Sequence, residues 1–413
     1  MKKVPNLRFK EFSDSWYCRK LNDILIDTRL GGNYKNTESI TPFPLIKMGN
    51  LSRGHINLNK IEYITHDEVL NSDDILQKGD LLFNTRNTLD LVGKVAIWNN
   101  ELELAYYNSN IMKLIFDSGQ VSNNYFMNYL FNTKSSLSRL KSFATGTTSV
   151  AAIYTKDLKQ MKIEIPSCRE QEKIAAFFSL IDKKIELQTE KVEELKNYKK
   201  GLLQKIFPRK GELVPELRFV GFTNDWEECK LEKVTKLITK GTTPKDKSWI
   251  GPVNYIKTES IDKDSGSLTR TASTSLEEHE GYLKRSQLQN NDVLFSIVGT
   301  LGRVGLVGLK DLPANTNQQI AIIRTDELNP YFLMNILKSP KVKSFIESDS
   351  TVGAQPSLSL WQINELKICV PSIAEQQKIG HYFFNLDKLI TLHQCKLDAL
   401  NEYKKGLLQQ MFI

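Results

Sequence analysis

The sequence contains one unit twice, and this repeat constrains the fold more than any other feature. Residues 4–16 read VPNLRFKEFSDSW and residues 214–226 read VPELRFVGFTNDW, so 7 of 13 positions agree. Residues 163–207 align without gaps to residues 368–412, with 22 identities in 45 positions and a shared YKKGLLQ near the end. A period of about 205 residues indicates a duplicated domain rather than a solenoid of short repeats.

The segments between the repeated stretches differ, with short islands of agreement. Residues 79–93 (GDLLFNTRNTLDLVG) resemble residues 291–305 (NDVLFSIVGTLGRVG), and Asn108-Ser109-Asn110 stands where the second copy has Asn317-Gln318-Gln319. We therefore predict four parts. They are a first variable domain (1–165), a central repeated helix (166–210), a second variable domain (211–370) and a C-terminal repeated helix (371–413).

The variable domains combine strand and helix patterns. Short β-rich runs between glycines and prolines predict strands at 80–84, 94–98, 111–116, 292–298 and 319–325. Segments 122–142 and 328–348 have helical patterns. We predict that each variable domain is mixed α/β (α+β), with a twisted sheet and a few peripheral helices.

Both repeated helices carry an apolar seam with steps of four and three residues, starting at Ile174 and Ile379. Eight of ten seam positions are apolar in each helix, and the two polar exceptions match between the copies. The exceptions are Gln188 with His393, and Lys199 with Lys404. This pattern predicts a coiled coil in which polar residues set the register at some cost in stability.

The start and length of these helices can also be predicted. A serine followed three residues later by glutamate (Ser167 with Glu170, Ser372 with Glu375) is typical of a capping box. About 38 residues at 1.5 Å each make a rod of roughly 55–60 Å. Two copies of one unit are most simply related by a pseudo-two-fold axis, so we expect antiparallel rods, a variable domain at each end, and the C-terminus near the N-terminus. The rods either only hold the domains together or also separate two binding sites and dock partners.

The composition favours a nucleic-acid partner weakly. The net charge is +8 and the pI is about 8.9, and excess lysine and arginine neutralise phosphates. Five scattered cysteines without a C-x-x-C pair argue against disulfides and zinc and favour a reducing compartment. The N-terminus lacks a signal-peptide pattern, and no apolar stretch is long enough to span a membrane. We therefore expect a soluble, cytoplasmic protein.

Taken together, the repeated motifs resemble the specificity subunit of type I restriction–modification enzymes. The residues that carry the resemblance are VP-LRF-F–W, the P-S–EQ-KI helix start and the YKKGLLQ–F helix end, each present twice. The resemblance implies that each variable domain is a target recognition domain that reads half of a bipartite, asymmetric site in double-stranded DNA. It also implies two methyltransferase subunits, which bind S-adenosylmethionine and methylate adenine. Two motor-nuclease (helicase-nuclease restriction) subunits, which use ATP and Mg, are implied as well.

The sequence lacks the motifs of the chemistry assigned to those partners. It contains no G-x-x-x-x-G-K-[ST] phosphate loop and no glycine-rich S-adenosylmethionine loop after a strand. Asn329-Pro330-Tyr331-Phe332 resembles the N-P-P-[YF] tetrad of adenine methyltransferases, but the second proline is missing, and we interpret it as a helix start. The five histidines have no metal-ligand spacing. We predict no catalytic residue, no metal and no cofactor in this chain, and a non-catalytic role.

Polar and basic side chains on loops are the candidates for reading DNA, because base edges specify a sequence and phosphates position the protein. The predicted residues are Lys47, Asn50, Arg86, Asn87, Thr88, Thr147, Thr148 and Ser149 in the first domain, and Lys240, Thr242, Thr243, Lys245, Lys257, Thr258, Arg303 and Gln355 in the second. The alternative for each is a merely solvated loop residue. Trp16 and Trp226 are expected in the core.

The outward faces and YKKGLLQ ends of the helices are candidates for docking the methyltransferase subunits. The predicted interface residues are Lys199, Lys200, Leu203, Lys404, Lys405 and Leu408. The basic pairs could instead run along phosphates. Two other functions compete with DNA specificity: an adaptor whose variable domains bind protein, and a self-contained restriction–methylation enzyme, which the missing motifs disfavour.

Overall fold

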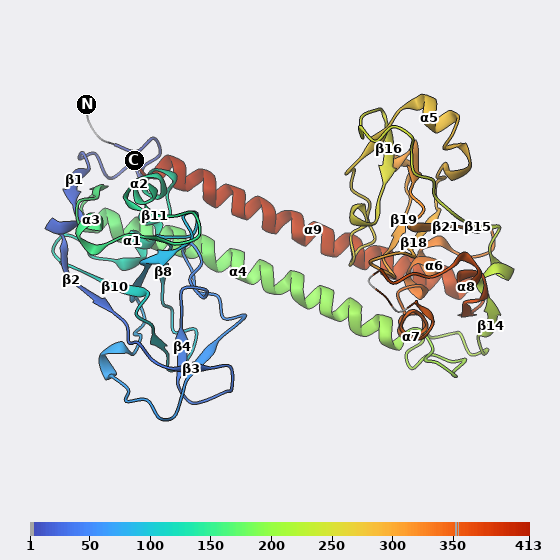
Figure 1. The fold of residues 1–413 in the computed structure, drawn as a ribbon, viewed down its shortest axis with the longest axis horizontal. Coiled ribbons are helices and arrows are strands. Elements are labelled where there is room, and N and C mark those ends of the chain that lie inside the picture. Colours follow the sequence, from blue (N-terminus) through green and yellow to red (C-terminus); the bar gives the residue numbers. More distant parts are fainter. Residues whose placement is uncertain (1–3, 352, 354) are drawn as a thin grey trace. The chain divides into compact units, whose positions relative to one another are not determined.

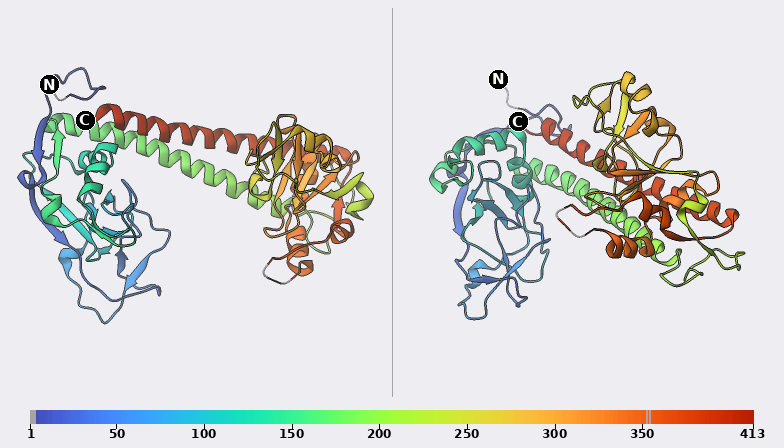
Figure 2. Two further views of the ribbon diagram at one scale, coloured as in Figure 1. Left: turned by 45° about the horizontal axis from the view of Figure 1, so that its top comes forward. Right: turned by 45° about the vertical axis from the view of Figure 1, so that its right-hand side comes forward.

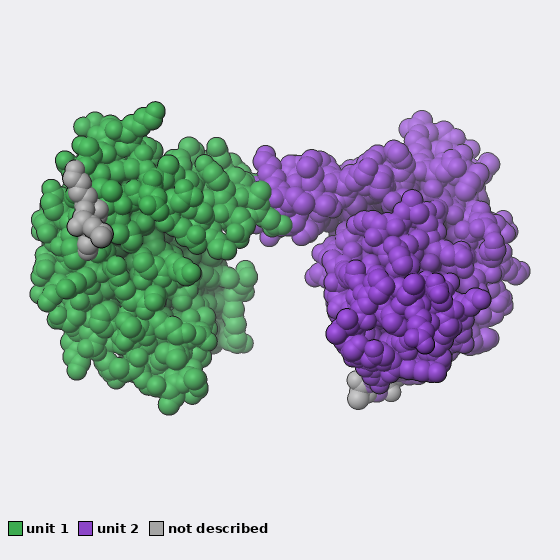
Figure 3. All heavy atoms as spheres, turned by 90° about the horizontal axis from the view of Figure 1, so that it is seen from above, with its two compact units in different colours: residues 1–187, 397–413 green, residues 188–396 purple. Residues whose placement is uncertain are grey.

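The computed structural model describes residues 4–413 except 352 and 354. The chain forms two compact units (Figure 3). Unit 1 comprises residues 1–187 and 397–413, and unit 2 comprises residues 188–396. The two long helices, α4 (Cys168–Lys205) and α9 (Ile373–Met411), each contribute one end to each unit. Each helix is therefore shared between the units instead of forming a part of its own.

Unit 1 is built on an antiparallel four-stranded sheet in the order β2-β10-β6-β8, beside a second sheet in the order β3-β5-β4-β9 (Figure 1). The two-stranded sheet β1-β13 and the ribbon β11-β12-β7 complete the strands of this unit. The bounds are β1 (Tyr17–Lys20), β2 (Leu25–Leu30), β3 (Asn36–Thr37), β4 (Pro44–Ile46), β5 (Glu62–Ile64), β6 (Leu81–Asn84), β7 (Arg86–Asn87), β8 (Val95–Ile97), β9 (Tyr106–Tyr107), β10 (Ile111–Phe116), β11 (Thr145–Gly146), β12 (Ala151–Ala152), β13 (Lys162–Ile165), α1 (Asn124–Phe131), α2 (Lys134–Phe143) and α3 (Thr155–Leu158).

Unit 2 repeats this plan with the antiparallel sheet β15-β21-β18-β19, the sheet β17-β16-β20 and the pair β14-β22. The bounds are β14 (Glu227–Lys230), β15 (Leu237–Lys240), β16 (Val253–Ile256), β17 (Ser273–Thr274), β18 (Val293–Ser296), β19 (Val304–Leu306), β20 (Ala314–Thr316), β21 (Ile320–Arg324), β22 (Lys367–Val370), α5 (Leu276–Glu280), α6 (Pro330–Ile336), α7 (Pro340–Asp349) and α8 (Leu360–Glu365). None of the helices in the described part of the chain is long and apolar enough to cross a membrane.

The predicted strands are confirmed as β6, β8, β10, β18 and β21, and the mixed α/β class is confirmed as well. The two segments predicted as helices are each divided into two helices, α1 with α2 and α6 with α7. The break follows from capping, because the Thr133 side chain accepts a hydrogen bond from the Ser136 backbone at the start of α2, and Pro340 occupies the first turn of α7.

The predicted seam between the long helices is present inside each unit. In unit 2 the Gln188 amide nitrogen lies 2.8 Å from Nδ1 of His393 and donates to its carbonyl at 2.8 Å, so the two polar seam residues contact each other. Further along, the hydroxyls of Tyr198 and Tyr382 are 2.9 Å apart, so the helices run antiparallel there. In unit 1 Asp182 pairs with Lys404. The start of α4 and the end of α9 lie side by side there (Figure 2), and apolar side chains from both belong to one core.

A buried ion pair fixes the start of each long helix. Arg8 donates to both carboxylate oxygens of Glu170 at 2.7 Å, and Arg218 donates to both oxygens of Glu375 at 2.8 Å. The prediction of a reciprocal capping box is therefore wrong in its second half, because the glutamates face these arginines. Only the serine half is present at Ser372, whose hydroxyl accepts from the Glu375 backbone.

Each unit also binds the C-terminal end of the long helix that comes from the other repeat. In unit 1 the Leu7 backbone donates to the Gln410 carbonyl at 2.9 Å, and Trp16 packs edge-on against Phe412. In unit 2 Leu217 donates to the Lys205 carbonyl at 2.9 Å, and Trp226 packs edge-on against Phe207. The predicted proximity of the N-terminal segment and the C-terminal end is thus confirmed within unit 1, and both tryptophans are core residues.

Candidate nucleic-acid interface

Two of the predicted loops in unit 1 lie side by side. In the ribbon β11-β12-β7, Ala151 pairs with Asn87 and Ala152 with Arg86. The Leu89 backbone also donates to the Thr148 carbonyl at 3.1 Å. The loops 84–88 and 145–149, which are about 60 positions apart in the sequence, therefore form one surface.

The side chains on this surface differ in how free they are. Arg86, Thr147, Thr148 and Ser149 are exposed. Among the residues that the structure describes, the Arg86 guanidinium has no hydrogen-bond or ion-pair partner. Thr147 and Ser149 bond to each other through their hydroxyls at 3.2 Å, and Asn87 accepts from the Thr88 backbone at 2.8 Å. Arg86 is the strongest candidate here, because a free guanidinium can donate two hydrogen bonds to a guanine edge.

A third loop, 31–37, joins this surface and was not predicted. The Gly32 backbone donates to the Tyr107 carbonyl at 3.1 Å, and the Ser109 backbone donates to the Gly32 carbonyl at 3.0 Å. Only glycine fits at Gly31, because a Cβ there would lie 2.0 Å from the Tyr107 carbonyl oxygen. Lys47 belongs to the same neighbourhood, but its ammonium is paired with Glu62 at 2.8 Å.

The corresponding loops of unit 2 meet in the same way. The Gly299 backbone donates to the Pro356 carbonyl at 2.9 Å, and the Leu358 backbone donates to the Ile297 carbonyl at 2.8 Å. These bonds place the exposed Gln355 beside the loop that follows β18, with its amide 3.9 Å from the Cβ position of Gly299. Gln355 therefore holds the place in unit 2 that the loop 145–149 holds in unit 1.

The basic loop at 240–245 forms the other half of the surface in unit 2. The Thr242 backbone donates to the Thr316 carbonyl at 2.8 Å, as Gly32 does to Tyr107 in unit 1. Lysines on this surface stack on aromatic rings. The ammonium of Lys257 lies 3.7 Å from the ring centre of Trp249, and that of Lys245 lies 4.7 Å from the ring centre of Tyr282. Arg285 donates to the Thr242 hydroxyl at 3.2 Å.

The sequence islands at 108–110 and 317–319 lie in the middle of these surfaces. Asn110 accepts from the Thr85 backbone on one side, while Ser109 bonds to Gly32 on the other. In unit 2, Gln319 accepts from Ile297 while Gln318 accepts from the Thr243 hydroxyl. We call these surfaces the candidate edges; they comprise residues 31–37, 84–88, 108–110 and 145–149 in unit 1, and 240–245, 297–299, 317–319 and 355–357 in unit 2.

Sequence reasoning missed Tyr34, Trp249, Tyr282 and Arg285, which lie on or beside these edges. The island at 108–110 and the glycine pair Gly31-Gly32 were available signals. Tyr34 has a structural role, because its hydroxyl donates to Asp74 at 2.6 Å and burial raises its pKa to about 12.

Three predicted reading residues are bound within the protein, and these predictions are corrected. Asn50 is 5% exposed, and its amide caps a turn by donating to the carbonyls of Asn57 and Lys60. Thr258 is buried, and its backbone carbonyl accepts from Arg303. Arg303 also donates to the Ile261 carbonyl at 3.0 Å, so its guanidinium ties two loops together instead of lying free on the surface.

The predicted partner-interface residues are divided between the seam and the surface. Lys199 is 5% exposed and pairs with Asp387 at 2.6 Å, which confirms its predicted place in the seam and leaves little of it for a partner to contact. Lys404 pairs with Asp182, and Leu203 and Leu408 pack against the cores of their units. Lys200 and Lys405 are exposed on the helices.

The tetrad at Asn329 is a helix start, as predicted. The Asn329 side chain accepts from the Phe332 backbone at 3.0 Å and Pro330 occupies the first turn of α6. Its counterpart Asn123 caps α1 by accepting from the Tyr125 backbone.

Two α/β domains, each with a loop-built edge and each anchored on a pair of long helices, define a duplicated recognition protein. A family described as the type I restriction modification DNA specificity domain matches residues 14–197 and 223–402. The chain belongs to this family and is a type I restriction–modification specificity subunit with two DNA-recognition domains.

Individual relatives cover nearly the whole chain. A putative type I restriction enzyme specificity subunit, MjaX, of Methanocaldococcus jannaschii is 23% identical over 96% of this chain and 93% of the relative. The MjaVIII specificity subunit of the same organism is 23% identical over 85% and 81%. Among solved structures, the type I S subunit from M. genitalium matches with a TM-score of 0.61 at 19% identity, over 99% of each chain. A chain from a structure on complex assembly and conformational transition of the type I system matches with a TM-score of 0.56 at 14% identity, over 98% of this chain and 99% of that one. These likenesses show the shared fold.

Proposed function

We propose that the two units read the two halves of a bipartite, asymmetric site in double-stranded DNA, one half each. The observation that carries this is the pair of candidate edges, which have the same backbone framework and different side chains. Arg86 is exposed on the edge of unit 1, while unit 2 offers Gln355 and the Lys257–Trp249 pair. Different donors and acceptors on one framework favour two different half-sites over a palindrome.

The basic residues of unit 2 support contact with the DNA backbone. Lys240 and Lys245 are exposed on one loop, and Lys257 lies on an aromatic ring beside it. Such residues position a protein on phosphates without reading bases. Binding through them weakens as salt rises, because the release of condensed counterions gains less entropy in a more concentrated salt solution.

We further propose that the long helices set the spacing of the half-sites and dock two methyltransferase subunits. Large apolar side chains on the helices remain exposed, notably Leu180 (57%) and Leu187 (55%) on α4, and Leu392 (65%) on α9. Leu180 and Leu187 are seven residues apart, so they lie on the same face of α4. An exposed apolar patch is typical of a protein-binding surface. In this account the methyltransferase subunits bind S-adenosylmethionine and methylate adenine, and two motor-nuclease subunits bring ATP and Mg. The specificity subunit contributes no catalytic group.

Reconstitution tests this proposal. Purified chain alone should transfer no methyl groups to DNA, whereas chain mixed with the methyltransferase subunit should methylate adenine at a defined sequence. Leu187→Glu with Leu392→Glu should abolish co-purification, while substitution of the edge residue Arg86 should preserve it. Methyl transfer by the chain alone would contradict the non-catalytic role. An assembled complex without affinity for any DNA would favour the adaptor function.

A further inference from the structure

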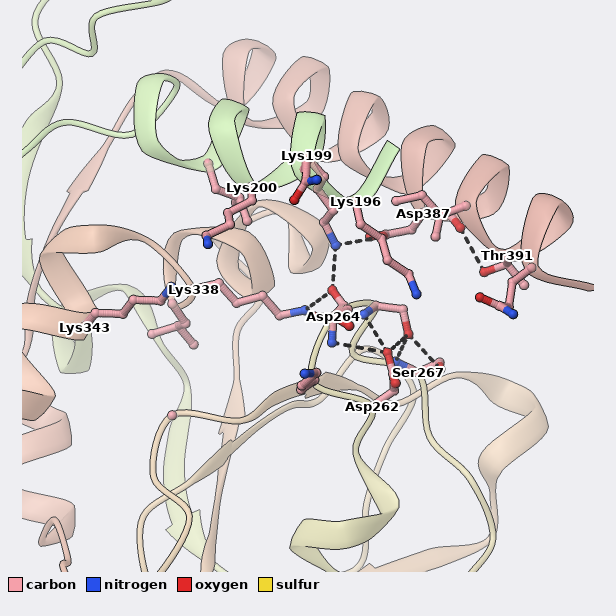
Figure 4. A pocket seen from close by; sticks show the side chains of 18 of the residues that line it. Lys196, Lys199, Lys200, Asp262, Asp264, Ser267, Lys338, Lys343, Asp387 and Thr391 are labelled. Atoms are coloured by element: carbon pink, nitrogen blue, oxygen red, sulfur yellow. Dashed lines mark hydrogen bonds and ion pairs between the residues drawn. The ribbon is translucent and has the colours of Figure 1, made fainter. Parts of the chain in front are cut away.

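Unit 2 contains a cavity of about 690 Å³ beside the seam (Figure 4). Its walls come from α4, from the loop 262–267, from the end of α6 with α7, and from α9. The volume is that of a pocket for a small molecule or for part of a larger ligand.

Most of the charged side chains that line the cavity are positive. Six lysines line it, namely Lys196, Lys199, Lys200, Lys263, Lys338 and Lys343, against three aspartates, Asp262, Asp264 and Asp387. Lys199 is neutralised by Asp387 at 2.6 Å. Within the described part of the chain, Lys196, Lys200 and Lys343 have no carboxylate within ion-pair distance. Ammonium groups that no carboxylate neutralises give the cavity a positive potential, which attracts anions.

The two units differ in the hydrogen bonds beside this cavity. In unit 1 the Tyr129 hydroxyl donates to Asp182 Oδ2 at 2.7 Å, and Asn132 binds the Val95 carbonyl through its amide. The corresponding positions in unit 2 are Asn335 and Lys338. Asn335 does not reach Asp387, the counterpart of Asp182, and Oδ2 of Asp387 is buried without a partner among the described residues. Unit 2 thus has an unfilled acceptor and an added ammonium where unit 1 has a closed hydrogen-bond network.

The surroundings of Lys338 disfavour its charged form, and a bound anion would favour it. Its ammonium contacts the Asp264 carbonyl at 3.3 Å. Burial and the neighbouring charge of Lys199 lower its pKa to about 7. A bound anion would stabilise the charged ammonium of Lys338 and would offset the repulsion between Lys338 and Lys199.

We propose that this cavity is an anion site that binds a phosphate group through Lys196, Lys200, Lys338 and Lys343. Lysine is a point-charge binder of phosphate, and four ammonium groups from three elements surround the cavity. The phosphate belongs either to the backbone of the DNA or to a free phosphorylated molecule. Gly302, which lines the cavity, lies in the β18–β19 turn, and this turn begins at the candidate edge. For this reason the DNA backbone is one of the two sources of the phosphate. The DNA source rests on the proposed function, whereas the anion site itself does not.

Lysine footprinting of the full chain tests the site. Solvent-accessible amines are acetylated with and without inorganic pyrophosphate, and the modification of each lysine is measured by mass spectrometry. Pyrophosphate should protect Lys196 and Lys343 and leave Lys405 unprotected, because Lys405 is exposed at the position in unit 1 that matches Lys200. The variant Lys196→Gln with Lys343→Gln should bind pyrophosphate about 10-fold more weakly. A matched control, Lys183→Gln with Lys184→Gln, removes two exposed charges from α4 outside the cavity and should leave binding unchanged.

A second arm uses a duplex that contains the methylated sequence of the complex. Protection of the same lysines by the duplex identifies the DNA backbone as the source. Each of these lysines that is replaced by glutamine should then lower the slope of log K against log [salt] by about 0.9. Protection by pyrophosphate alone identifies a free phosphorylated molecule. Equal modification of Lys196, Lys343 and Lys405 with either anion overturns the proposal. Failure of sequence-specific DNA binding by the complex would refute the proposed function and leave the pyrophosphate result standing.

Discussion

Arg8 binds Glu170 through two hydrogen bonds of 2.7 Å although 162 positions separate them, and Arg218 binds Glu375 in the same way. Both glutamates are 1% exposed at the first turn of a long helix. The hydrogen bonds to Glu170 raise the pKa of Arg8. These pairs join the N-terminal segment of each repeat to the helix that ends it, so they close each unit on itself.

Replacing Arg8 by methionine should destabilise unit 1 by about 3 kcal/mol, because the Glu170 carboxylate would remain buried without its partner. Hydrogen exchange across the start of α4 measures this loss locally, and unit 2 serves as the internal control. Arg218→Met should move the effect to unit 2. The double variant Arg8→Met with Glu170→Met should regain part of the loss. An unchanged exchange rate in Arg8→Met would contradict the role of the pair.

Gln188 and His393 should be coupled in stability. Replacing Gln188 alone by leucine removes its two contacts with His393 in the seam and should cost about 1 kcal/mol. Replacing both by leucine should raise the melting midpoint by about 2–4 °C, because a polar seam residue sets register at a cost in stability. A double-mutant cycle from denaturant titrations measures the coupling, and additive effects would show that the pair is not coupled.

Arg86 and Arg303 should behave differently when replaced by alanine. Arg86 is exposed and its guanidinium has no partner among the described residues, so Arg86→Ala should preserve stability and lower affinity for the cognate site by about 1–3 kcal/mol. Arg303 donates to the carbonyls of Thr258 and Ile261, so Arg303→Ala should destabilise unit 2. Thermal unfolding together with DNA binding separates the two effects. Equal loss of stability in both variants would contradict this assignment.

Lys338 should make stability depend on pH. Its folded pKa is about 7, below the usual 10.5, so between these values the unfolded chain binds more protons than the folded chain. Stability therefore rises with pH from about 7 to about 10, by at most about 1.4 kcal/mol for each pH unit. Below pH 7 the contribution is constant. The difference in unfolding free energy between the wild type and Lys338→Met should show this slope, and parallel pH profiles would contradict it.

Much of the fold follows from patterns that the sequence displays directly. The apolar seam repeats every seven residues, so the burial of Ile174 and Ile379 and the contact of Gln188 with His393 could be predicted from spacing alone. The strands were predictable because their apolar runs end at turn residues. The Arg8–Glu170 pair was not, because nothing in the local sequence distinguishes a capping glutamate from one that binds a distant arginine.

The candidate edges were predicted only in part, for a similar reason. The island at 291–305 was aligned to 79–93 without gaps, but Phe295 pairs with Val304 while Phe83 pairs with Val95. The second turn is therefore shorter, and Arg303 stands where unit 1 has Lys94. The loop 31–37 was missed because its neighbours, 84–88 and 108–110, come together with it only in the folded sheet.

Base-resolution mapping of methylated adenine in cells that carry the complete system tests whether each unit reads one half-site. It should show a bipartite motif with an unread spacer and one methylated adenine in each half. Arg86→Ala should alter only one half of this motif, and Gln355→Ala should alter only the other. A continuous palindromic motif, or a single substitution that changes both halves, would contradict the assignment of one half-site to each unit.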